Sequence, residues 1–173
     1  MVDWEANIRE KPLLGERVYV APSAVVVGRV RIGDHSSLWA NVSARGDVHW
    51  MRIGERTNIQ DNTVLHVTYG SHPLEIGDDV TVGHGCVIHG CSIKERCLIG
   101  MGSVVLDGAV VGPEAMVGAG SVVKQGEVIP SGTLYVGVPA RYKRDLTEEE
   151  IASILESAQE YAKYAAEYLR LSL

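Results

Sequence analysis

The chain has 173 residues, with 16 lysines and arginines against 22 aspartates and glutamates, and a formal net charge of −6. This length suits one ordinary domain, and the acidic balance disfavours nucleic acid as the main partner because phosphate binding needs a basic patch. No uncharged stretch approaches the roughly 20 residues of a membrane-spanning helix, the N-terminus does not resemble a signal peptide, and three cysteines do not make a disulfide framework. We therefore expect a soluble cytoplasmic protein without a nucleic-acid or membrane partner. Nineteen glycines and no phenylalanine predict a narrow aliphatic core.

A repeat of aliphatic residues at every sixth position runs through most of the chain. In chain order these positions are Val20, Val26, Ile32, Leu38, Ile53, Ile59, Leu65, Ile76, Val82, Ile88, Ile93, Ile99, Val105, Val111, Val117, Val123 and Ile129. Because six is even, the repeated residues face one side of an extended chain, and the glycine and polar residues between them supply turns. Short repeats of this kind indicate a parallel β-solenoid in which three hexads make one triangular coil of about eighteen residues.

The alternative interpretation is an α/β domain with Val-rich strands, which the unbroken spacing from Ile93 to Ile129 disfavours. The pattern resembles the hexapeptide-repeat superfamily, and that resemblance implies an all-β fold, a single-stranded left-handed parallel β-helix. The handedness comes from the resemblance and not from the spacing. We expect this domain to occupy residues 1–140.

The repeat is interrupted at three places. Residues 44–51 fit the register poorly, and the step from Ile88 to Ile93 is five residues. The step from Leu65 to Ile76 is eleven residues instead of six, so a loop of about five extra residues lies near Thr68 to Leu74. Interruptions in a solenoid mark loops on its outer surface, often at a site.

Two histidines occupy the same position of different coils. His66 and His89 each follow an inward-facing aliphatic residue, so both point outward. They are 23 residues apart, and subtracting five loop residues leaves eighteen, one full coil. We therefore expect the two imidazoles to stack about 4.8 Å apart at one edge, where they could share one metal ion with bonds of about 2.1 Å.

A third histidine lies on a neighbouring edge. His84 precedes His89 by five residues, which span roughly 16 Å of extended chain. If three histidines bind one ion, His84 must come from another copy of the chain, an arrangement that suits a threefold ring with three interface sites. Three neutral imidazoles with an open fourth position suit catalytic zinc, and Fe(II) or Co(II) would also fit. Cys91 is a weaker ligand candidate, whereas Cys86 and Cys97 fall at inward core positions.

Other polar residues flank these histidines. Gln60 occupies the same hexad position as the histidine pair but one edge earlier. Like His84, it should face the histidine pair of a neighbouring copy, where its amide could hydrogen-bond a metal-bound water. Asn58 and Asp61 flank Gln60, and a role as turn residues is at least as consistent with their positions as catalysis. Arg45 and Asp47 are two residues apart, so they point the same way and could bridge subunits.

The hexad pattern ends after Pro139. Thr147 followed by three glutamates is a capping box. A helical apolar stripe follows, made of Ile151, Ile154, Leu155, Ala158, Tyr161, Ala162, Ala165 and Leu169. We expect residues 141–173 to form a C-terminal helical segment that packs along the prism, although it could also contact a neighbouring subunit.

Together these residues resemble the gamma-class carbonic anhydrases and their ferripyochelin-binding-protein-like relatives over nearly the whole chain. The similarity is carried by Ala44-Arg45-Gly46-Asp47, Asn58-Ile59-Gln60-Asp61-Asn62, Leu65-His66, Gly83-His84-Gly85, Ile88-His89-Gly90 and Gly137-Val138-Pro139-Ala140. The resemblance implies a homotrimer in which His66 and His89 of one subunit and His84 of the next hold a metal at each interface. It also implies that Arg45 and Asp47 form an intersubunit ion pair, that Gln60 orients the metal-bound hydroxide, and that Tyr135 matches a site tyrosine.

The resemblance implies reversible hydration of carbon dioxide to bicarbonate, with Gln60, Asn58, Asp61 and Tyr135 as the candidate catalytic residues. The short loop lacks the family's glutamate proton shuttle, and Val48 follows Asp47 where the family has a second glutamate, so we expect slow, buffer-dependent turnover. His72, in the loop, is a candidate replacement shuttle. Three alternatives stay open: a metal-dependent thioesterase or hydrolase on coenzyme A thioesters, a hexapeptide acyltransferase that needs no metal, and an assembly subunit with a vestigial site.

Overall fold

The structure is a computed structural model that describes residues 4–172. Its elements in chain order are α1 (Trp4–Arg9), β1 (Leu13–Leu14), β2 (Tyr19–Val20), β3 (Val25–Ile32), β4 (Ser37–Leu38), β5 (Ser43–Ile53), β6 (Asn58–Ile59), β7 (Val64–His66), β8 (Leu74–Ile76), β9 (Thr81–Val82), β10 (Val87–His89), β11 (Ser92–Ile93), β12 (Leu98–Ile99), β13 (Val104–Val105), β14 (Val110–Val111), β15 (Met116–Val117), β16 (Val122–Val123), β17 (Val128–Ile129), β18 (Thr133–Val136), β19 (Arg141–Asp145) and α2 (Glu148–Leu171).

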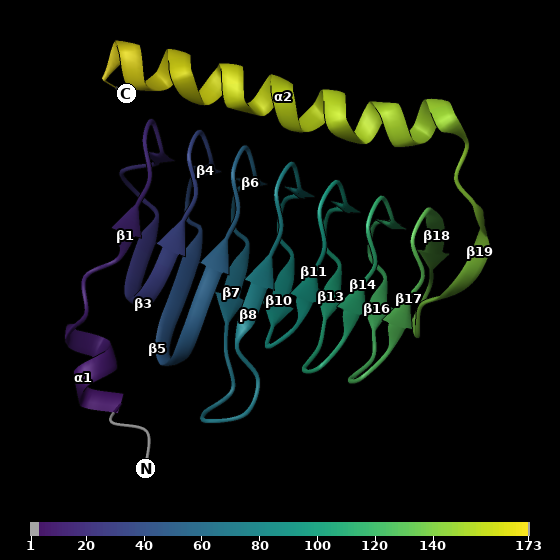
Figure 1. The fold of residues 1–173 in the computed structure, drawn as a ribbon, viewed down its shortest axis with the longest axis horizontal. Coiled ribbons are helices and arrows are strands. Elements are labelled where there is room, and N and C mark those ends of the chain that lie inside the picture. The colour runs from purple at the N-terminus through teal and green to yellow at the C-terminus, as the bar shows by residue number, and fades with distance from the viewer. Residues whose placement is uncertain (1–3, 173) are drawn as a thin grey trace.

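The strands wind into a parallel β-solenoid, as the hexads predict (Figure 1). One sheet of eleven strands follows the order β16-β13-β10-β7-β5-β8-β11-β14-β17, with β3 pairing β5 and β1 at its side. A second sheet of eight strands follows the order β19-β18-β15-β12-β9-β6-β4-β2. Because neighbours in each sheet come from successive coils, residues at equivalent corners of the coils stack along the solenoid.

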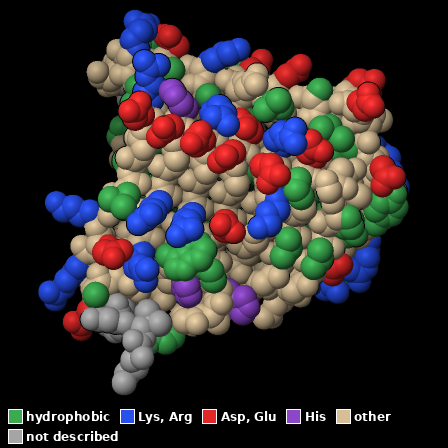
Figure 2. Space-filling view, viewed as in Figure 1, with side chains coloured by type: hydrophobic (Ala, Val, Ile, Leu, Met, Phe, Trp, Pro, Cys, Tyr) green, Lys and Arg blue, Asp and Glu red, His purple; other side chains and the backbone are tan. Residues whose placement is uncertain are grey.

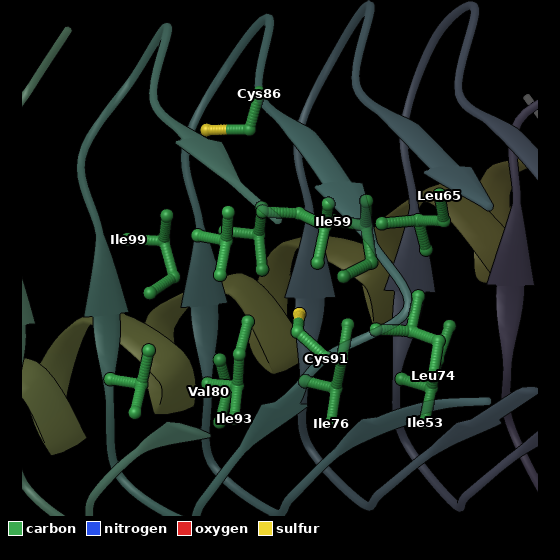
Figure 3. Packing of buried hydrophobic residues seen from close by; sticks show 14 of the residues in the cluster. Ile53, Ile59, Leu65, Leu74, Ile76, Val80, Cys86, Cys91, Ile93 and Ile99 are labelled. Atoms are coloured by element: carbon green, nitrogen blue, oxygen red, sulfur yellow. The ribbon is translucent and has the colours of Figure 1, made fainter. Parts of the chain in front are cut away.

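The repeated aliphatic residues form the core. From Ile93 to Ile129 all seven are 0% exposed, and cross-strand pairs such as Ile76 with Ile93 place the repeated residues directly above one another (Figure 3). The three cysteines are buried and free. The interior is therefore a stack of thin side chains, which explains how the chain builds a core without phenylalanine.

The interruptions of the repeat have clear structural counterparts. Residues 44–51 belong to the long strand β5, which pairs with β3 across a register shift between Gly28 and Val30. The extra residues after β7 form a small loop closed by a bridge between Thr68 and His72. Leu74 already belongs to β8 and is fully buried, so the loop ends one residue earlier than the spacing suggests.

The helix α2 lies along the second sheet and contacts β2, β4, β6 and β9. Its capping box is formed by Thr147 and Glu150, as predicted. Ile154, Ala158 and Ala165 of the apolar stripe are buried, whereas Leu169 is exposed. The segment from residue 141 does not begin as a helix, because β19 first pairs antiparallel with β18. Within residues 4–172 no helix is both long and apolar enough to cross a membrane.

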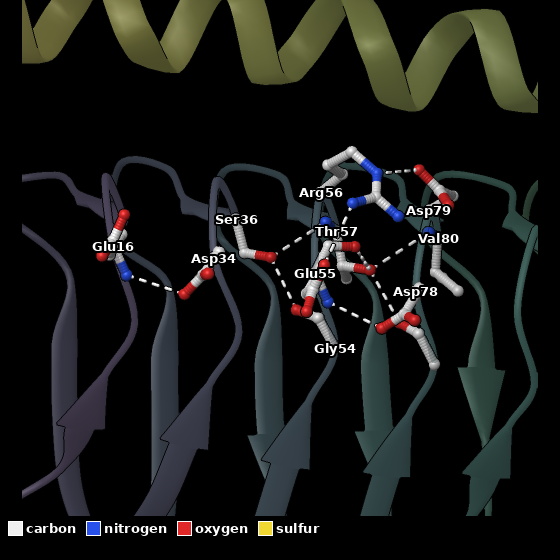
Figure 4. A network of polar contacts seen from close by, with 11 residues as sticks. Glu16, Asp34, Ser36, Gly54, Glu55, Arg56, Thr57, Asp78, Asp79 and Val80 are labelled. Atoms are coloured by element: carbon white, nitrogen blue, oxygen red, sulfur yellow. Dashed lines mark hydrogen bonds and ion pairs between the residues drawn. The ribbon is translucent and has the colours of Figure 1, made fainter.

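The solenoid corners beneath α2 are tied together by polar side chains (Figure 4). The Arg56 guanidinium donates to Asp79 at 2.7 Å and 3.0 Å, and the Thr57 hydroxyl donates to the Gly77 carbonyl at 2.7 Å. Acidic and basic side chains are interspersed on the face shown in Figure 2, and no continuous basic surface is seen there. This distribution agrees with the acidic charge balance of the sequence.

Candidate metal centre

His66 and His89 form a pair at one corner of the solenoid. They end strands β7 and β10 and are register partners in the parallel ladder. Their ring centroids are 5.1 Å apart, and His66 Nδ1 lies 3.0 Å from His89 Nε2. The two side chains are 19% and 31% exposed. The predicted stacking of the two imidazoles is therefore confirmed, and one nitrogen of each ring faces the other.

A carboxylate holds the outer nitrogen of each ring. Asp47 Oδ1 lies 3.1 Å from His66 Nε2, and Asp107 Oδ1 lies 2.6 Å from His89 Nδ1. An ionised carboxylate only accepts hydrogen bonds, so each outer nitrogen donates its hydrogen. In neutral imidazoles the two facing nitrogens then both present lone pairs. Two lone pairs at 3.0 Å repel one another unless a cation binds them both.

The pKa shifts favour this arrangement of protons. Burial lowers the pKa of His66, and Arg45 and His89 add to the effect, while Asp47 opposes it. Burial alone would raise the pKa of Asp47, but hydrogen bonds from Arg45 and His66 outweigh it and lower the pKa. Near neutral pH the imidazole of His66 is therefore neutral and Asp47 is ionised, which are the forms that metal binding requires.

Gln60 and its neighbours lie on the other edge, beside His84. His84 Nδ1 is 2.9 Å from Asp61 Oδ2. Gln60 is 6% exposed, and its Nε2 donates to Asn58 Oδ1 at 3.1 Å. Asn58 is in turn fixed by donating to Thr81 Oγ1 at 2.9 Å. The structure therefore brings Gln60, Asn58, Asp61 and His84 to one edge, with Asn58 and Asp61 acting as supports of their neighbours.

The part of the chain that the structure describes brings two imidazoles together but does not complete a metal-ligand set. Among residues 4–172 no group of three or more His, Cys, Asp or Glu side chains is placed to hold a metal. Three of the surface hollows, of about 470, 610 and 460 Å³, are lined by other residues and include none of His66, His84 and His89. The contribution of His84 from a neighbouring copy stays a prediction.

Other residues singled out from the sequence fall in different places. Arg45 forms its ion pair with Asp47 within the chain, and an intersubunit pair stays a prediction. Tyr135 extends the hexad row and packs against the core, with its ring 6.1 Å from that of Tyr142. Cys91 is 4% exposed, and burial raises the pKa of its thiol far above the ordinary value. Such a thiol is a poor metal ligand, so Cys91 belongs to the core.

Sequence reasoning missed Asp107 and Thr68. Asp107 follows β13, the strand that pairs with β10. It therefore lies at the same corner of the solenoid as His89, one coil further along. The Thr68 hydroxyl donates to Asp107 Oδ2 at 2.6 Å. The sequence did carry a signal for Asp107. It stands two residues beyond Val105, and Val105 is the register partner of Ile88, the residue before His89.

Comparison with known proteins places this architecture in a family. Residues 90–125 match the model of the bacterial transferase hexapeptide family, described as six repeats. The chain is 54% identical to a Methanocaldococcus jannaschii protein named "Probable carbonic anhydrase", covering 87% of this chain and 94% of the relative. The chain belongs to the gamma-class carbonic anhydrase family of hexapeptide-repeat proteins. A mitochondrial relative from Arabidopsis thaliana, named gamma carbonic anhydrase 1, is 47% identical over 92% of this chain and 60% of that protein.

The same family includes relatives with other names. Protein YrdA of Escherichia coli is 51% identical, covering 91% of this chain and 89% of the relative. Among solved structures, a candidate acetyltransferase from Bacillus cereus superposes with a TM-score of 0.92 at 42% identity, covering 94% of both chains. The chain is therefore similar both to proteins named carbonic anhydrase and to a solved structure named as a candidate acetyltransferase.

The residues present fit a divalent metal as part of its ligand set. Two nitrogen ligands of a tetrahedral ion lie about 3.4 Å apart for bonds of about 2.1 Å, close to the 3.0 Å between the facing nitrogens of His66 and His89. A carboxylate on the outer nitrogen is the usual support of a metal-bound histidine. Asp47 and Asp107 supply one such support for each ring.

Proposed function

We propose that this chain catalyses the reversible hydration of carbon dioxide to bicarbonate at metal sites between the subunits of a homotrimer. His66 and His89 of one subunit and His84 of the next would hold the ion. The proposal is carried by one observation: two imidazoles face each other at 3.0 Å while a carboxylate holds the outer nitrogen of each. The gamma-class relatives support the choice of reaction.

The metal bound by these histidines would supply the Lewis acidity that makes water a nucleophile near neutral pH. Zinc suits nitrogen donors and an open position, and Fe(II) or Co(II) suit the same donors. The protein supplies orientation. Gln60 is buried and held through its Nε2 by Asn58, so its side-chain carbonyl oxygen is left to accept a hydrogen bond and fix the direction of the attacking group. Asp47 and Asp107 keep the ring nitrogens deprotonated where the ion binds.

The test combines metal analysis with kinetics on the purified protein. We expect about one divalent ion per chain and hydration of carbon dioxide that a chelator abolishes and added Zn²⁺ restores. His66→Ala should lose both metal and activity. His35→Asn is the matched control, because His35 adopts a positive φ of 59° that asparagine tolerates. Metal-loaded protein without measurable hydration would overturn the proposal.

A second candidate is acyl transfer or thioester hydrolysis, which the similarity to the Bacillus cereus candidate acetyltransferase favours. The same preparation distinguishes the candidates when it is given acetyl coenzyme A. A metal-dependent thioesterase would release free thiol in a reaction that the chelator stops. An acyltransferase would need an acceptor and would be indifferent to the chelator. Metal with neither activity would favour the assembly subunit.

A further inference from the structure

Asp107 connects the histidine pair to the inserted loop. One of its oxygens, Oδ1, lies 2.6 Å from His89 Nδ1. The other, Oδ2, accepts from the Thr68 hydroxyl at 2.6 Å. The side chain is 22% exposed, so the contacts are partly shielded from water. Asp107 therefore joins β10 to a loop that begins two residues after His66, and both of its oxygens are occupied.

The backbone around Asp107 makes room for these contacts. Gly90, directly after His89, has a φ of +51°, and a Cβ on it would overlap Asp107 Oδ1 and lie 2.8 Å from the Cβ of His72. Gly108, directly after Asp107, has a φ of +69°, and its amide donates to the Gly90 carbonyl at 2.8 Å. Two glycines thus bring the two corners together and leave a gap that the carboxylate fills.

We propose that Asp107 is a positioning residue for the metal centre. This role rests on the proposed metal-dependent function. Asp107 holds His89 as the tautomer with hydrogen on Nδ1, so that Nε2 faces His66 with its lone pair. Thr68 fixes the orientation of the carboxylate. Outer partners of this kind are general in metal sites, and removing one typically lowers metal affinity 10–100-fold.

The contact geometry separates this role from simple attachment of the loop. Attachment would need only the bond from Thr68 to Oδ2. The other oxygen, Oδ1, instead approaches the His89 ring nitrogen that faces away from His66, and a glycine at position 90 is required to leave room for it. Loss of Thr68 should therefore weaken the site less than loss of Asp107, because the carboxylate remains beside His89.

The test uses two readouts on full-length protein. The first is Zn²⁺ affinity by competition with a chromophoric chelator. The second is the His89 tautomer, read from ring-nitrogen NMR shifts of the metal-free protein. We expect Asp107→Ala to lower Zn²⁺ affinity 10–100-fold and to release His89 into a mixture of tautomers, with a smaller loss in Thr68→Val. Asp107→Asn keeps the shape of the side chain and should fall between Asp107→Ala and wild type.

Asp78→Ala is the matched control. Asp78 also links two coils, by accepting from the Glu55 amide at 2.8 Å, and its loss should change neither readout. An unchanged tautomer in Asp107→Ala would overturn the inference, as would a changed tautomer with unchanged Zn²⁺ affinity. If the wild-type chain binds no Zn²⁺, the proposed function fails, and the tautomer measurement still decides whether Asp107 positions His89. If Asp107→Ala does not fold, Asp107→Asn supplies both the Zn²⁺ affinity and the His89 tautomer.

Discussion

His66 and His89 are 23 residues apart in sequence, yet their facing ring nitrogens lie 3.0 Å from one another. The parallel ladder places the two residues in register, and the loop between them leaves the coil without disturbing it. The solenoid thus repeats one corner position and presents the same ring twice. An ion bound by this pair still needs a further ligand, which residues 4–172 of the same chain do not place beside it.

We expect His84→Ala to lose metal as completely as His66→Ala, although His84 lies on the other edge beside Asp61. If the chain forms the proposed homotrimer, mixing the two variants after unfolding and refolding would give trimers with both chain types. If one chain supplies His66 and His89 and the next supplies His84, each mixed trimer regains one intact site out of three. Metal analysis of the mixture measures this recovery. Mixed trimers without metal would show that His84 does not act across the interface.

The hexad pattern predicts that truncating an inward-facing residue lowers the free energy of unfolding far more than truncating its outward-facing neighbour. Ile129 is 0% exposed and Val128 is 61% exposed. Truncating Ile129 to alanine removes buried methyl groups and leaves a cavity, so we expect a loss of about 2–4 kcal/mol in the free energy of unfolding. Val128→Ala should stay within about 0.5 kcal/mol. Chemical denaturation of both variants measures the difference, and equal losses would contradict the assignment of inward and outward positions.

Ile129 also shows why so much of the fold could be predicted. An even period fixes which side chains face inward, and a constant coil length fixes which corners stack, so the aliphatic core and the His66–His89 pair follow from counting. Asp107 could not be found in that way. It belongs to a corner, where side-chain direction depends on local turns such as those at Gly90 and Gly108. The short helix α1 and the antiparallel strand β19 lie outside the repeat, so the spacing carries no information about them.

Substitution of Gly90 tests whether the gap beside Asp107 matters for metal binding. Alanine at Gly90 would adopt a positive φ of 51° and would collide with Asp107 and His72. Gly120 has a similar φ of 69° but open space where a Cβ would lie. Both alanine variants should lose about 1–2 kcal/mol of stability from backbone strain, and only Gly90→Ala should also lose metal affinity. Zn²⁺ competition with both proteins decides this, and equal affinities would show that the gap beside Asp107 does not matter.

The start of α2 should respond to acid. Hydrogen bonds lower the pKa of Glu150 to about 2 from an ordinary value of 4.5. The larger effect comes from the Arg144 side chain and the smaller one from the Thr147 amide. Because the folded pKa is the lower one, the stability that Glu150 contributes is complete above about pH 4.5 and is lost as the pH falls towards 2. The difference in Tm between wild type and Glu150→Gln should therefore shrink on acidification. Glu160→Gln, on an exposed part of the same helix, is the control. A difference that does not change with pH would contradict this role of Glu150.

Hydration of carbon dioxide would release a proton that must reach the solvent. His72 lies in the loop after β7, closed by the bridge to Thr68, and a Cβ on Gly108 would lie 3.3 Å from its Nε2. Its ring is thus held against the residue next to Asp107. Imidazole is the side chain best suited to exchange protons with buffer near neutral pH. If His72 carries the proton, His72→Ala should hydrate carbon dioxide more slowly in weak buffer.

Added imidazole distinguishes this role from a structural one. It should restore the steady-state rate of His72→Ala and change the wild-type rate much less, because only the variant lacks its own carrier. His49→Gln is the matched control, since His49 is on β5 and accepts from the Trp50 amide at 2.9 Å. Equal rates for wild type and His72→Ala at every imidazole concentration would remove His72 from the proton path and leave buffer to collect the proton directly from the edge where His66 and His89 meet.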